Sequence, residues 1–265
     1  MSEHLLLEKK GAIATLTMNR PESRNALSVQ MREKLFESMQ DIETDDSIRC
    51  VVVKGAGDHF MAGGDVISFA EIAKKDPDER QKIFENRIHG LHPTIFTMRR
   101  MQKPIIASVQ GAAAGFGLSL AMACDMVIAA DSSFFTLAYI NIATTPDGSG
   151  TYSLPRIVGL KKAMEIAMLG DRFDAAEAQR LGLVNFVVPS AKLEEETDKL
   201  AKRLAAGPTV AIGRTKRLMH ESLVNDMEKQ LALEAENFAA CARTDDWAEG
   251  IFAFGEKRKP EFKGK

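Results

Sequence analysis

The chain has 265 residues, of which 45% are hydrophobic and 27% charged, a composition typical of a protein with a large buried core. Its 35 Lys and Arg residues against 37 Asp and Glu residues give a formal net charge of −2 at pH 7. This balance argues against a broad nucleic-acid-binding surface and against binding to anionic membranes, because both depend on summed positive charge.

Short apolar runs alternate with longer amphipathic ones along the chain, which is typical of an α/β protein. Between the first two runs, Ser28 is a suitable N-cap for a helix that extends to about Glu43. One face of this helix collects Leu35, Phe36, Met39 and Ile42, so we expect it to pack on the core. The strands predicted in this way are Ala12–Met18, Cys50–Lys54, Ile105–Val109, Met126–Ala129 and Leu183–Val188.

The interval from Pro104 to Pro155 is poor in charge and contains only three charged residues, Asp125, Asp131 and Asp147. Its first part is long enough to span a membrane, but it includes proline, glutamine, glycine and serine. We therefore predict a buried strand, a glycine turn and a buried helix, with no membrane span. Asp125 and Asp131 flank a predicted buried strand, and we expect structural roles for both.

The C-terminal part of the chain has clear helix signals. Pro155 predicts the first turn of a helix that runs through Met168 and stops at Gly170. Asp174 and Glu177 have the spacing of a capping box before a short helix. After Pro189 the pattern is helical, so we predict an α/β core over residues 1–195 and a helical region over residues 196–265.

Several familiar site motifs are absent or incomplete. The glycines that begin at Gly55 and Gly115 do not complete a dinucleotide-binding fingerprint, and Ser149 lacks the glycine spacing of a nucleophile elbow. His89 and His92 could present two metal ligands on a helix, but no carboxylate or cysteine accompanies them in that segment. The cysteines form no CxxC pair, which argues against a disulfide framework and favours a reducing cytoplasm. We expect no metal site.

Two glycine-rich turns each follow a predicted strand, at residues 59–65 and 110–117. Glycine and alanine at such turns allow a ligand to approach backbone N–H groups closely, and a helix N-terminus adds positive potential. Two such donors directed at one carbonyl oxygen form an oxyanion hole. The alternative is that these are tight turns that only permit close packing.

The chain resembles the crotonase superfamily, which is the enoyl-CoA hydratase/isomerase family, in a series of segments whose order and spacing match. The resemblance implies an α/β fold made of a spiral of repeated ββα units with a C-terminal helical trimerisation region. It also implies an acyl-CoA thioester substrate, no cofactor apart from the coenzyme A of that substrate, and a homotrimer or a dimer of trimers. The matching segments are Asn19–Leu27, Met61–Asp65, Gly111–Asp125, Pro146–Gly148, Leu154–Gly159 and Ala253–Arg258.

The resemblance also assigns roles to particular residues. The backbone N–H groups of Gly64 and Phe116 match the oxyanion hole, although the family usually has glycine at the position of Phe116. Coenzyme A contacts within the chain match Arg24, Ala26 and Ala62. Contacts to the coenzyme A site of a neighbouring subunit match Phe254 and Lys257.

The acid and base groups decide which reaction follows. The two glutamates of similar hydratases match Ser119 and Tyr139, neither of which is a carboxylate, so we expect both to line or pack the pocket. The pair Pro146-Asp147 is similar to enoyl-CoA isomerases in which a single aspartate moves a proton between C2 and C4. A turn-forming role is the alternative for Asp147, since it precedes glycine.

Three other functions stay open at this point. The chain could be a hydratase with a modified acid and base set. It could also be a hydrolase similar to the chlorobenzoyl-CoA dehalogenases, which use an aspartate matching Asp147 and a histidine matching His92, although Tyr139 stands where they have tryptophan. A non-catalytic acyl-CoA-binding protein is the third. The acyl pocket is expected to be lined by segments such as Ser68–Met98 and Phe134–Thr144, and its preferred acyl group is not defined by the sequence.

Overall fold

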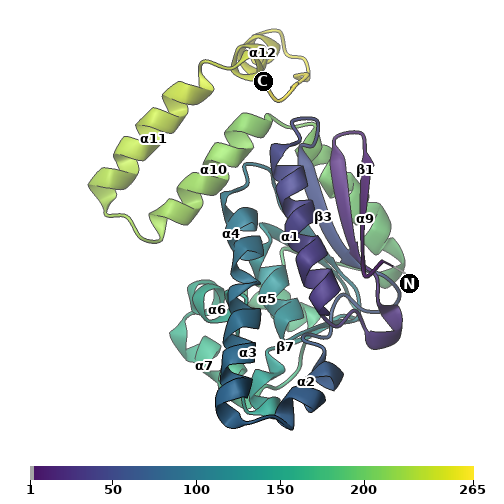
Figure 1. The fold of residues 1–265 in the computed structure, drawn as a ribbon. Helices are drawn as coiled ribbons and strands as arrows, with labels where there is room; N and C mark the ends of the chain where they lie inside the picture. The colour runs from purple at the N-terminus through teal and green to yellow at the C-terminus, as the bar shows by residue number, and fades with distance from the viewer. Residues whose placement is uncertain (1–2) are drawn as a thin grey trace.

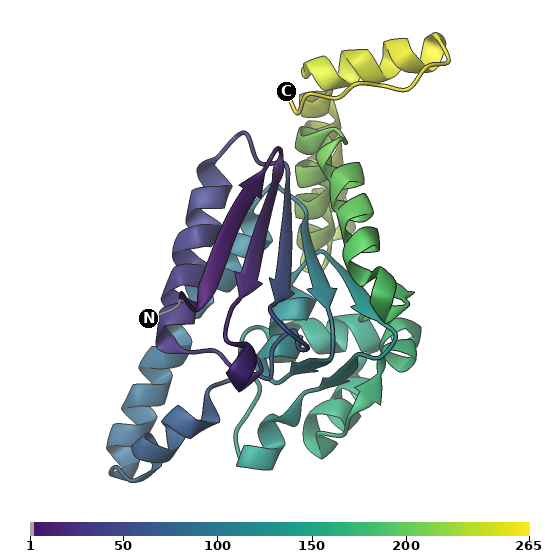
Figure 2. The same cartoon turned by 90° about the vertical axis from the view of Figure 1, so that its right-hand side faces the viewer.

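The computed structural model describes residues 3–265, which form two sheets surrounded by helices (Figures 1 and 2). The strands are β1 (Leu5–Lys10), β2 (Ile13–Met18), β3 (Cys50–Gly55), β4 (Ile105–Val109), β5 (Ala112–Ala114), β6 (Met126–Ala130), β7 (Phe134–Thr136), β8 (Phe173–Asp174) and β9 (Phe186–Val188). The α-helices are α1 (Val29–Thr44), α2 (Val66–Ala73), α3 (Pro77–His89), α4 (His92–Arg100), α5 (Phe116–Ala123), α6 (Gly150–Val158), α7 (Leu160–Leu169), α8 (Ala175–Arg180), α9 (Leu193–Ala205), α10 (Thr209–Ser222), α11 (Met227–Cys241) and α12 (Asp245–Gly255). Three 3-10 helices are η1 (Pro21–Ser23), η2 (Ala138–Ile142) and η3 (Ser190–Lys192).

The larger sheet has six strands in the order β1-β2-β3-β4-β6-β9, and only its β1–β2 pair is antiparallel. A smaller sheet has the order β5-β7-β8. Four of the predicted strands are confirmed to within one residue at each end, as β2, β3, β4 and β6. The predicted strand Leu183–Val188 is observed only over Phe186–Val188.

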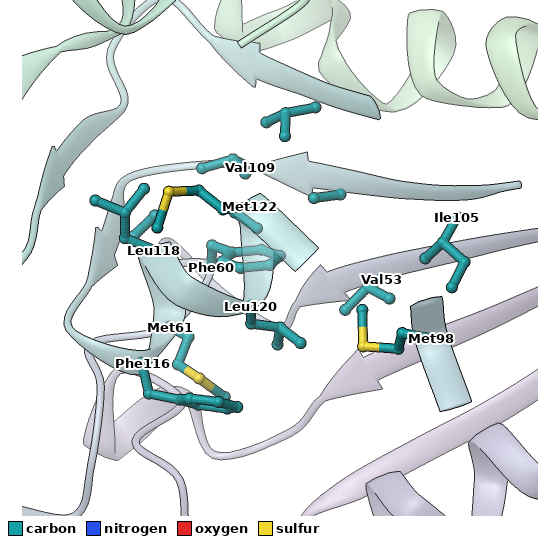
Figure 3. Close-up of a cluster of buried hydrophobic side chains, with 14 of the residues drawn as sticks. Val53, Phe60, Met61, Met98, Ile105, Val109, Phe116, Leu118, Leu120 and Met122 are labelled. Atoms are coloured by element: carbon teal, nitrogen blue, oxygen red, sulfur yellow. The ribbon is translucent and has the colours of Figure 1, made fainter. Parts of the chain in front are cut away.

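The central strands are continuous apolar runs because both faces of the larger sheet are covered by helices. Val51 and Val53 of β3 point into a core shared with α1, α4 and α5. The alternate residues Cys50 and Val52 pack toward α9 on the opposite face. Figure 3 shows part of the first core, in which Val53 lies near Met98 while residues of α5 gather around Phe60.

Helix α1 begins as the sequence predicts, since the Ser28 hydroxyl accepts a hydrogen bond of 3.1 Å from the Met31 backbone N–H. Its buried face differs slightly from the prediction, because Met31 is buried whereas Phe36 is only half-buried. The Asp174 N-cap before α8 is also confirmed, with its carboxylate accepting a 2.8 Å bond from the Glu177 N–H. Among the described residues the Glu177 carboxylate accepts from Arg180 rather than from the Asp174 N–H, so the reciprocal half of the predicted capping box is not observed.

The prediction of one helix that begins at Pro155 and runs to Gly170 is wrong, because the structure has two helices there. Helix α6 begins earlier, at Gly150, and Pro155 lies inside it. Pro155 is the sixth residue of this helix, where it removes one N–H donor, and α6 ends three residues later. Gly159, at a φ of +77°, then separates α6 from α7, which ends at Gly170 as predicted.

The C-terminal region is helical, as the sequence predicts. Helix α9 packs on the larger sheet, whereas α10 and α11 form a pair beside the body, with α12 beyond their end (Figures 1 and 2). Large apolar side chains remain exposed on these three helices, among them Met219, Met227, Phe238, Phe252 and Phe254. No helix within residues 3–265 has the length and apolarity needed to cross a membrane.

Candidate active site

A cavity of about 610 Å³ is bounded by the two glycine turns, the start of α1, helices α2 to α4 and the loop after η2. This position follows from the fold, because the turns come directly after the carboxyl ends of the neighbouring parallel strands β3 and β4. Six of the predicted site residues lie in the wall of this cavity, namely Ala62, Gly64, His92, Phe116, Tyr139 and Asp147.

The backbones of the two glycine turns lie against each other. Gly63 has a φ of +103° and Gly115 a φ of +52°, both in the region that favours glycine. A Cβ atom placed on Gly63 would lie 3.1 Å from the Ala114 carbonyl oxygen, and one on Gly115 would lie 3.6 Å from the Gly63 Cα. The turns therefore need glycine in order to approach this closely.

Hydrogen bonds fix the two turns in register. The Met61 N–H donates to the Ala112 carbonyl and the Ala114 N–H donates to the Met61 carbonyl, both at 2.9 Å. In the part of the chain that the structure describes, the N–H groups of Gly64 and Phe116 donate to no acceptor. Phe116 is also the first residue of α5, where the helix dipole is positive. Both donors are thus available to a ligand carbonyl at the wall of the cavity.

Asp147 lies on the loop after η2 and is connected to Tyr139 and, through it, to Ser119. The Tyr139 hydroxyl donates a hydrogen bond of 2.5 Å to Asp147 Oδ1, and Ser119 Oγ lies 3.4 Å from the same hydroxyl. Burial raises the pKa of Asp147, while the bond from Tyr139 and the charge of His92 oppose the rise. The pKa of Tyr139 is raised mainly by burial and, to a smaller extent, by the negative charge of Asp147. Tyr139 is therefore a neutral donor at physiological pH.

The Phe116 side chain supports the loop that bears Asp147. Gly148 has a φ of +56°, and a Cβ atom there would lie 2.6 Å from the Phe116 ring. The ring itself is 2% exposed and packs beside Met61 (Figure 3). The Phe116 residue therefore keeps its backbone N–H at the cavity wall while its ring packs under the Asp147 loop.

The predicted coenzyme A residues of the N-terminal half lie next to the first glycine turn. The Ala62 N–H donates to the Arg24 carbonyl at 2.9 Å, and the Leu27 N–H donates to the Gly63 carbonyl at 2.8 Å. The segment from Arg24 to Leu27, which includes Ala26, therefore runs beside the turn. Arg24 adopts a positive φ of 50°, which holds it in a sharp bend after η1.

Five predicted residues do not line the cavity of their own chain: Arg24 and Ala26, which lie beside the first glycine turn, and Ser119, Phe254 and Lys257. Ser119 is fully buried behind Tyr139 and does not reach the cavity surface. Phe254 and Lys257 lie at the end of α12, which projects with the C-terminal helices, and Phe254 is 87% exposed. A role for these last two residues in a coenzyme A site therefore depends on a neighbouring subunit.

Sequence reasoning missed two arginines and the link between Tyr139 and Asp147. Arg32 of α1 and Arg87 of α3 line the cavity, with an Arg32 guanidinium N–H donating to the Arg87 carbonyl at 3.2 Å. No local motif marks them, because their proximity arises from helices that are distant in sequence. The rings of His89 and His92 lie 5.4 Å apart, and the described residues contain no cluster of three or more side chains suited to a metal ion.

Comparisons with known proteins agree with this architecture. The family profile described as "Enoyl-CoA hydratase/isomerase" matches residues 8–265. The chain is 35% identical over 265 residues to 1,2-epoxyphenylacetyl-CoA isomerase of Escherichia coli (strain K12), with 100% of both chains covered. It is 33% identical over 265 residues to crotonyl-CoA hydratase of Syntrophomonas wolfei, with 98% of both covered. The crystal structure of an enoyl-CoA hydratase from Polaromonas sp. JS666 is similar at a TM-score of 0.92 and 35% identity, covering 98% of this chain and 99% of that one.

The structure is therefore an α/β crotonase-like fold with C-terminal helices. The chain belongs to the enoyl-CoA hydratase/isomerase family and is an enzyme of that family that acts on acyl-CoA. The family includes both isomerases and hydratases, so the choice of reaction depends on the groups in the cavity.

Proposed function

We propose that this enzyme is an enoyl-CoA isomerase that moves a double bond from C3–C4 to C2–C3 of an acyl-CoA thioester. The observation that supports this best is the carboxylate content of the cavity. Among the described residues that line it, Asp147 is the only one with a carboxylate side chain. Hydration by the family's two-glutamate arrangement needs two carboxylates, whereas a proton shuttle needs one base and an oxyanion hole.

In the proposed reaction the thioester oxygen accepts hydrogen bonds from the N–H groups of Gly64 and Phe116. Asp147 takes a proton from C2, and the electrons of that C–H bond move into the dienolate. The Asp147 carboxyl then returns the same proton to C4, which leaves the double bond between C2 and C3. Burial supports this role because it raises the pKa of Asp147 and makes the carboxylate a stronger base. No atom is gained from water.

The acyl group is proposed to extend toward α2 and α3. A second cavity of about 560 Å³ shares an apolar wall with the first, formed by Val66, Phe69, Phe84 and Ile142. These residues fall within or beside the two segments that the sequence indicates for the acyl pocket. A large or elongated apolar acyl group would bury its surface there.

The proposal predicts isomerisation without a change in mass. A panel of straight-chain, branched and aromatic 3-enoyl-CoA esters, followed by chromatography and mass spectrometry, should show conversion of at least one ester to its 2-enoyl isomer. A product heavier by one water molecule would instead indicate hydration. If no ester binds at millimolar concentration, the assignment of an acyl-CoA substrate is itself wrong.

A second candidate reaction rests on His92, which lines the same cavity as Asp147 and whose charge opposes the rise in the pKa of Asp147. In a hydrolytic reaction of the dehalogenase type, Asp147 would attack the ring of a haloaromatic acyl group and displace its halide, and His92 would assist water in hydrolysing the resulting ester at Asp147. Hydration by a modified set of groups would likewise need a route for water activation. Both differ from the proton shuttle in that oxygen from water enters the product or the enzyme.

We further propose that residues 196–265 form the oligomerisation region of a homotrimer or a dimer of trimers. The support is the row of exposed apolar side chains on α10 to α12, including Met227 and Phe238. Burial of such side chains stabilises subunit contacts. In that assembly Phe254 and Lys257 would reach the coenzyme A site of a neighbouring subunit.

The double variant Phe238→Asp with Phe252→Asp is expected to convert the oligomer to monomers, because it places charges on side chains that would be buried at the interface. Size-exclusion chromatography with light scattering measures the result. Leu6→Asp, which changes an exposed apolar residue of β1 on the sheet edge, is the matched control and should leave the oligomer intact. A monomeric unmodified protein would contradict this proposal.

A further inference from the structure

The two carboxylate oxygens of Asp147 have different surroundings. Oδ1 accepts the 2.5 Å hydrogen bond from the Tyr139 hydroxyl. Oδ2 accepts no side-chain hydrogen bond from any residue that the structure describes, and it is not sealed from the cavity that Asp147 lines. One oxygen is therefore engaged by the protein, and the other is free to meet a substrate.

Tyr139 is itself held firmly. Its side chain is only 9% exposed, and its backbone is fixed within η2, where the Thr144 N–H donates to the Tyr139 carbonyl at 3.2 Å. The ring packs against Gly115, since a Cβ atom placed there would lie 3.9 Å from the ring carbon that bears the hydroxyl. The other neighbour of the hydroxyl is Ser119 Oγ, at the longer distance of 3.4 Å.

This geometry points to an additional role within the proposed reaction. Building on the proposed proton shuttle, we infer that Tyr139 is a positioning residue that fixes the Asp147 carboxylate with Oδ1 bound and Oδ2 directed at C2 and C4 of the acyl group. Tyr139 also defines which Asp147 oxygen receives the proton. Tyr139, which matches the position of a hydratase glutamate, thus orients the carboxylate of Asp147.

Tyr139 is not suited to carry the proton away. Its hydroxyl leads only to Ser119, which is fully buried, so a relay through these two residues would not reach solvent. The hydroxyl stays neutral because burial and the charge of Asp147 raise its pKa. It can therefore donate to Oδ1 both before and after Oδ2 takes the proton from the substrate.

Tyr139→Phe tests this inference because it removes the hydroxyl and keeps the ring. A hydrogen bond to a charged group contributes about 1.5–3 kcal/mol, so kcat should fall roughly ten- to hundredfold while KM for the CoA ester changes little. Tyr152→Phe is the matched control, since Tyr152 is the chain's other tyrosine and its hydroxyl bonds Arg99 outside the cavity. This control should retain the unmodified rate.

The pH profile separates positioning from simple packing. Activity needs ionised Asp147 and is lost as the pH falls through its pKa. The Tyr139 hydrogen bond holds that pKa down, so its removal should move the acidic limb of kcat/KM to higher pH. The other polar groups around the site, His92 of α4 with Arg32 and Arg87 from α1 and α3, are unchanged in this variant.

Exchange of the C2 protons with deuterium oxide provides a readout that does not depend on product formation. Tyr139→Phe should slow this exchange by the same factor as kcat, and Asp147→Asn should stop it. If Tyr139→Phe leaves kcat, exchange and the acidic limb unchanged while Asp147→Asn is inactive, Tyr139 is not a positioning residue. If Asp147→Asn retains activity, the proposed isomerase function fails, whatever Tyr139→Phe does.

Discussion

Asp147→Asn is expected to lower kcat for 3-enoyl-CoA isomerisation by roughly 10²–10⁴-fold or more, because positioned acid–base groups contribute about that much and the cavity offers no second carboxylate. The substitution keeps the size of the side chain and an oxygen that can accept the Tyr139 hydrogen bond. Binding of the CoA ester should therefore persist within about threefold of the unmodified protein. Steady-state kinetics and titration calorimetry measure the two quantities separately.

Asp131→Asn provides the control for this result. Asp131 belongs to the same charge-poor interval, but its carboxylate bonds the exposed Ser190 and lies outside the cavity. Isomerisation by this control should match that of the unmodified protein. Asp147→Asn with undiminished turnover would remove Asp147 from the mechanism.

The second large effect is expected from the ion pair that joins the C-terminal helices to the core. Lys216 of α10 lies 2.8 Å from Asp125 Oδ2 and donates to the Met98 carbonyl at 2.7 Å. The Ile105 N–H also donates to Asp125 Oδ2 at 2.8 Å. Loss of one partner of a buried ion pair costs about 3–5 kcal/mol, because it leaves an uncompensated charge. Lys216→Met should therefore lower the free energy of unfolding by about that amount.

The loss should depend on pH in a defined direction. Burial raises the pKa of Asp125, and Lys216 is the main group that opposes this rise. Without Lys216 the folded state therefore holds a proton on Asp125 at pH values where the unfolded chain has lost it. Stability of the variant is then greater at acidic pH and falls as the pH rises toward the folded pKa, so the deficit should be larger at pH 8 than at pH 5.

Urea unfolding at the two pH values measures this deficit. The double variant Asp125→Asn with Lys216→Met removes both charges while an amide oxygen still accepts from Ile105. It should recover much of the stability lost in Lys216→Met and show little dependence on pH between the two conditions. A deficit of Lys216→Met that is the same at both pH values, or a double variant less stable than the single one, would contradict the role assigned to the pair.

Elements with strong local signals could be predicted from the sequence. The side chains of Ser28 and Asp174 cap α1 and α8 as expected, and Ile105–Val109 is a strand buried on both faces. The short strands of the smaller sheet were not predicted. The strand Ala112–Ala114 has no β-branched residue and exists because it pairs with Phe134–Thr136, a contact distant in sequence.

In the candidate site, too, features with a local signal could be predicted, whereas features that depend on contacts in three dimensions could not. The two glycine turns are marked by their sequence and Asp147 is indicated by the resemblance to the family, and all three line one cavity. The hydrogen bond from Tyr139 to Asp147 depends on how η2 and the following loop fold back, and no spacing rule encodes that. The support that the Phe116 ring gives to Gly148 likewise becomes visible only in three dimensions.

A single turnover of a 3-enoyl-CoA ester in water enriched in oxygen-18 tests the proton shuttle most directly. Mass spectrometry of the product and of the peptide that contains Asp147 locates the label. The proton shuttle predicts a 2-enoyl-CoA product of unchanged mass and no oxygen-18 in either species. Oxygen-18 in the product would instead show addition of water, and oxygen-18 in Asp147 would show attack by its carboxylate; either result would contradict the isomerase mechanism.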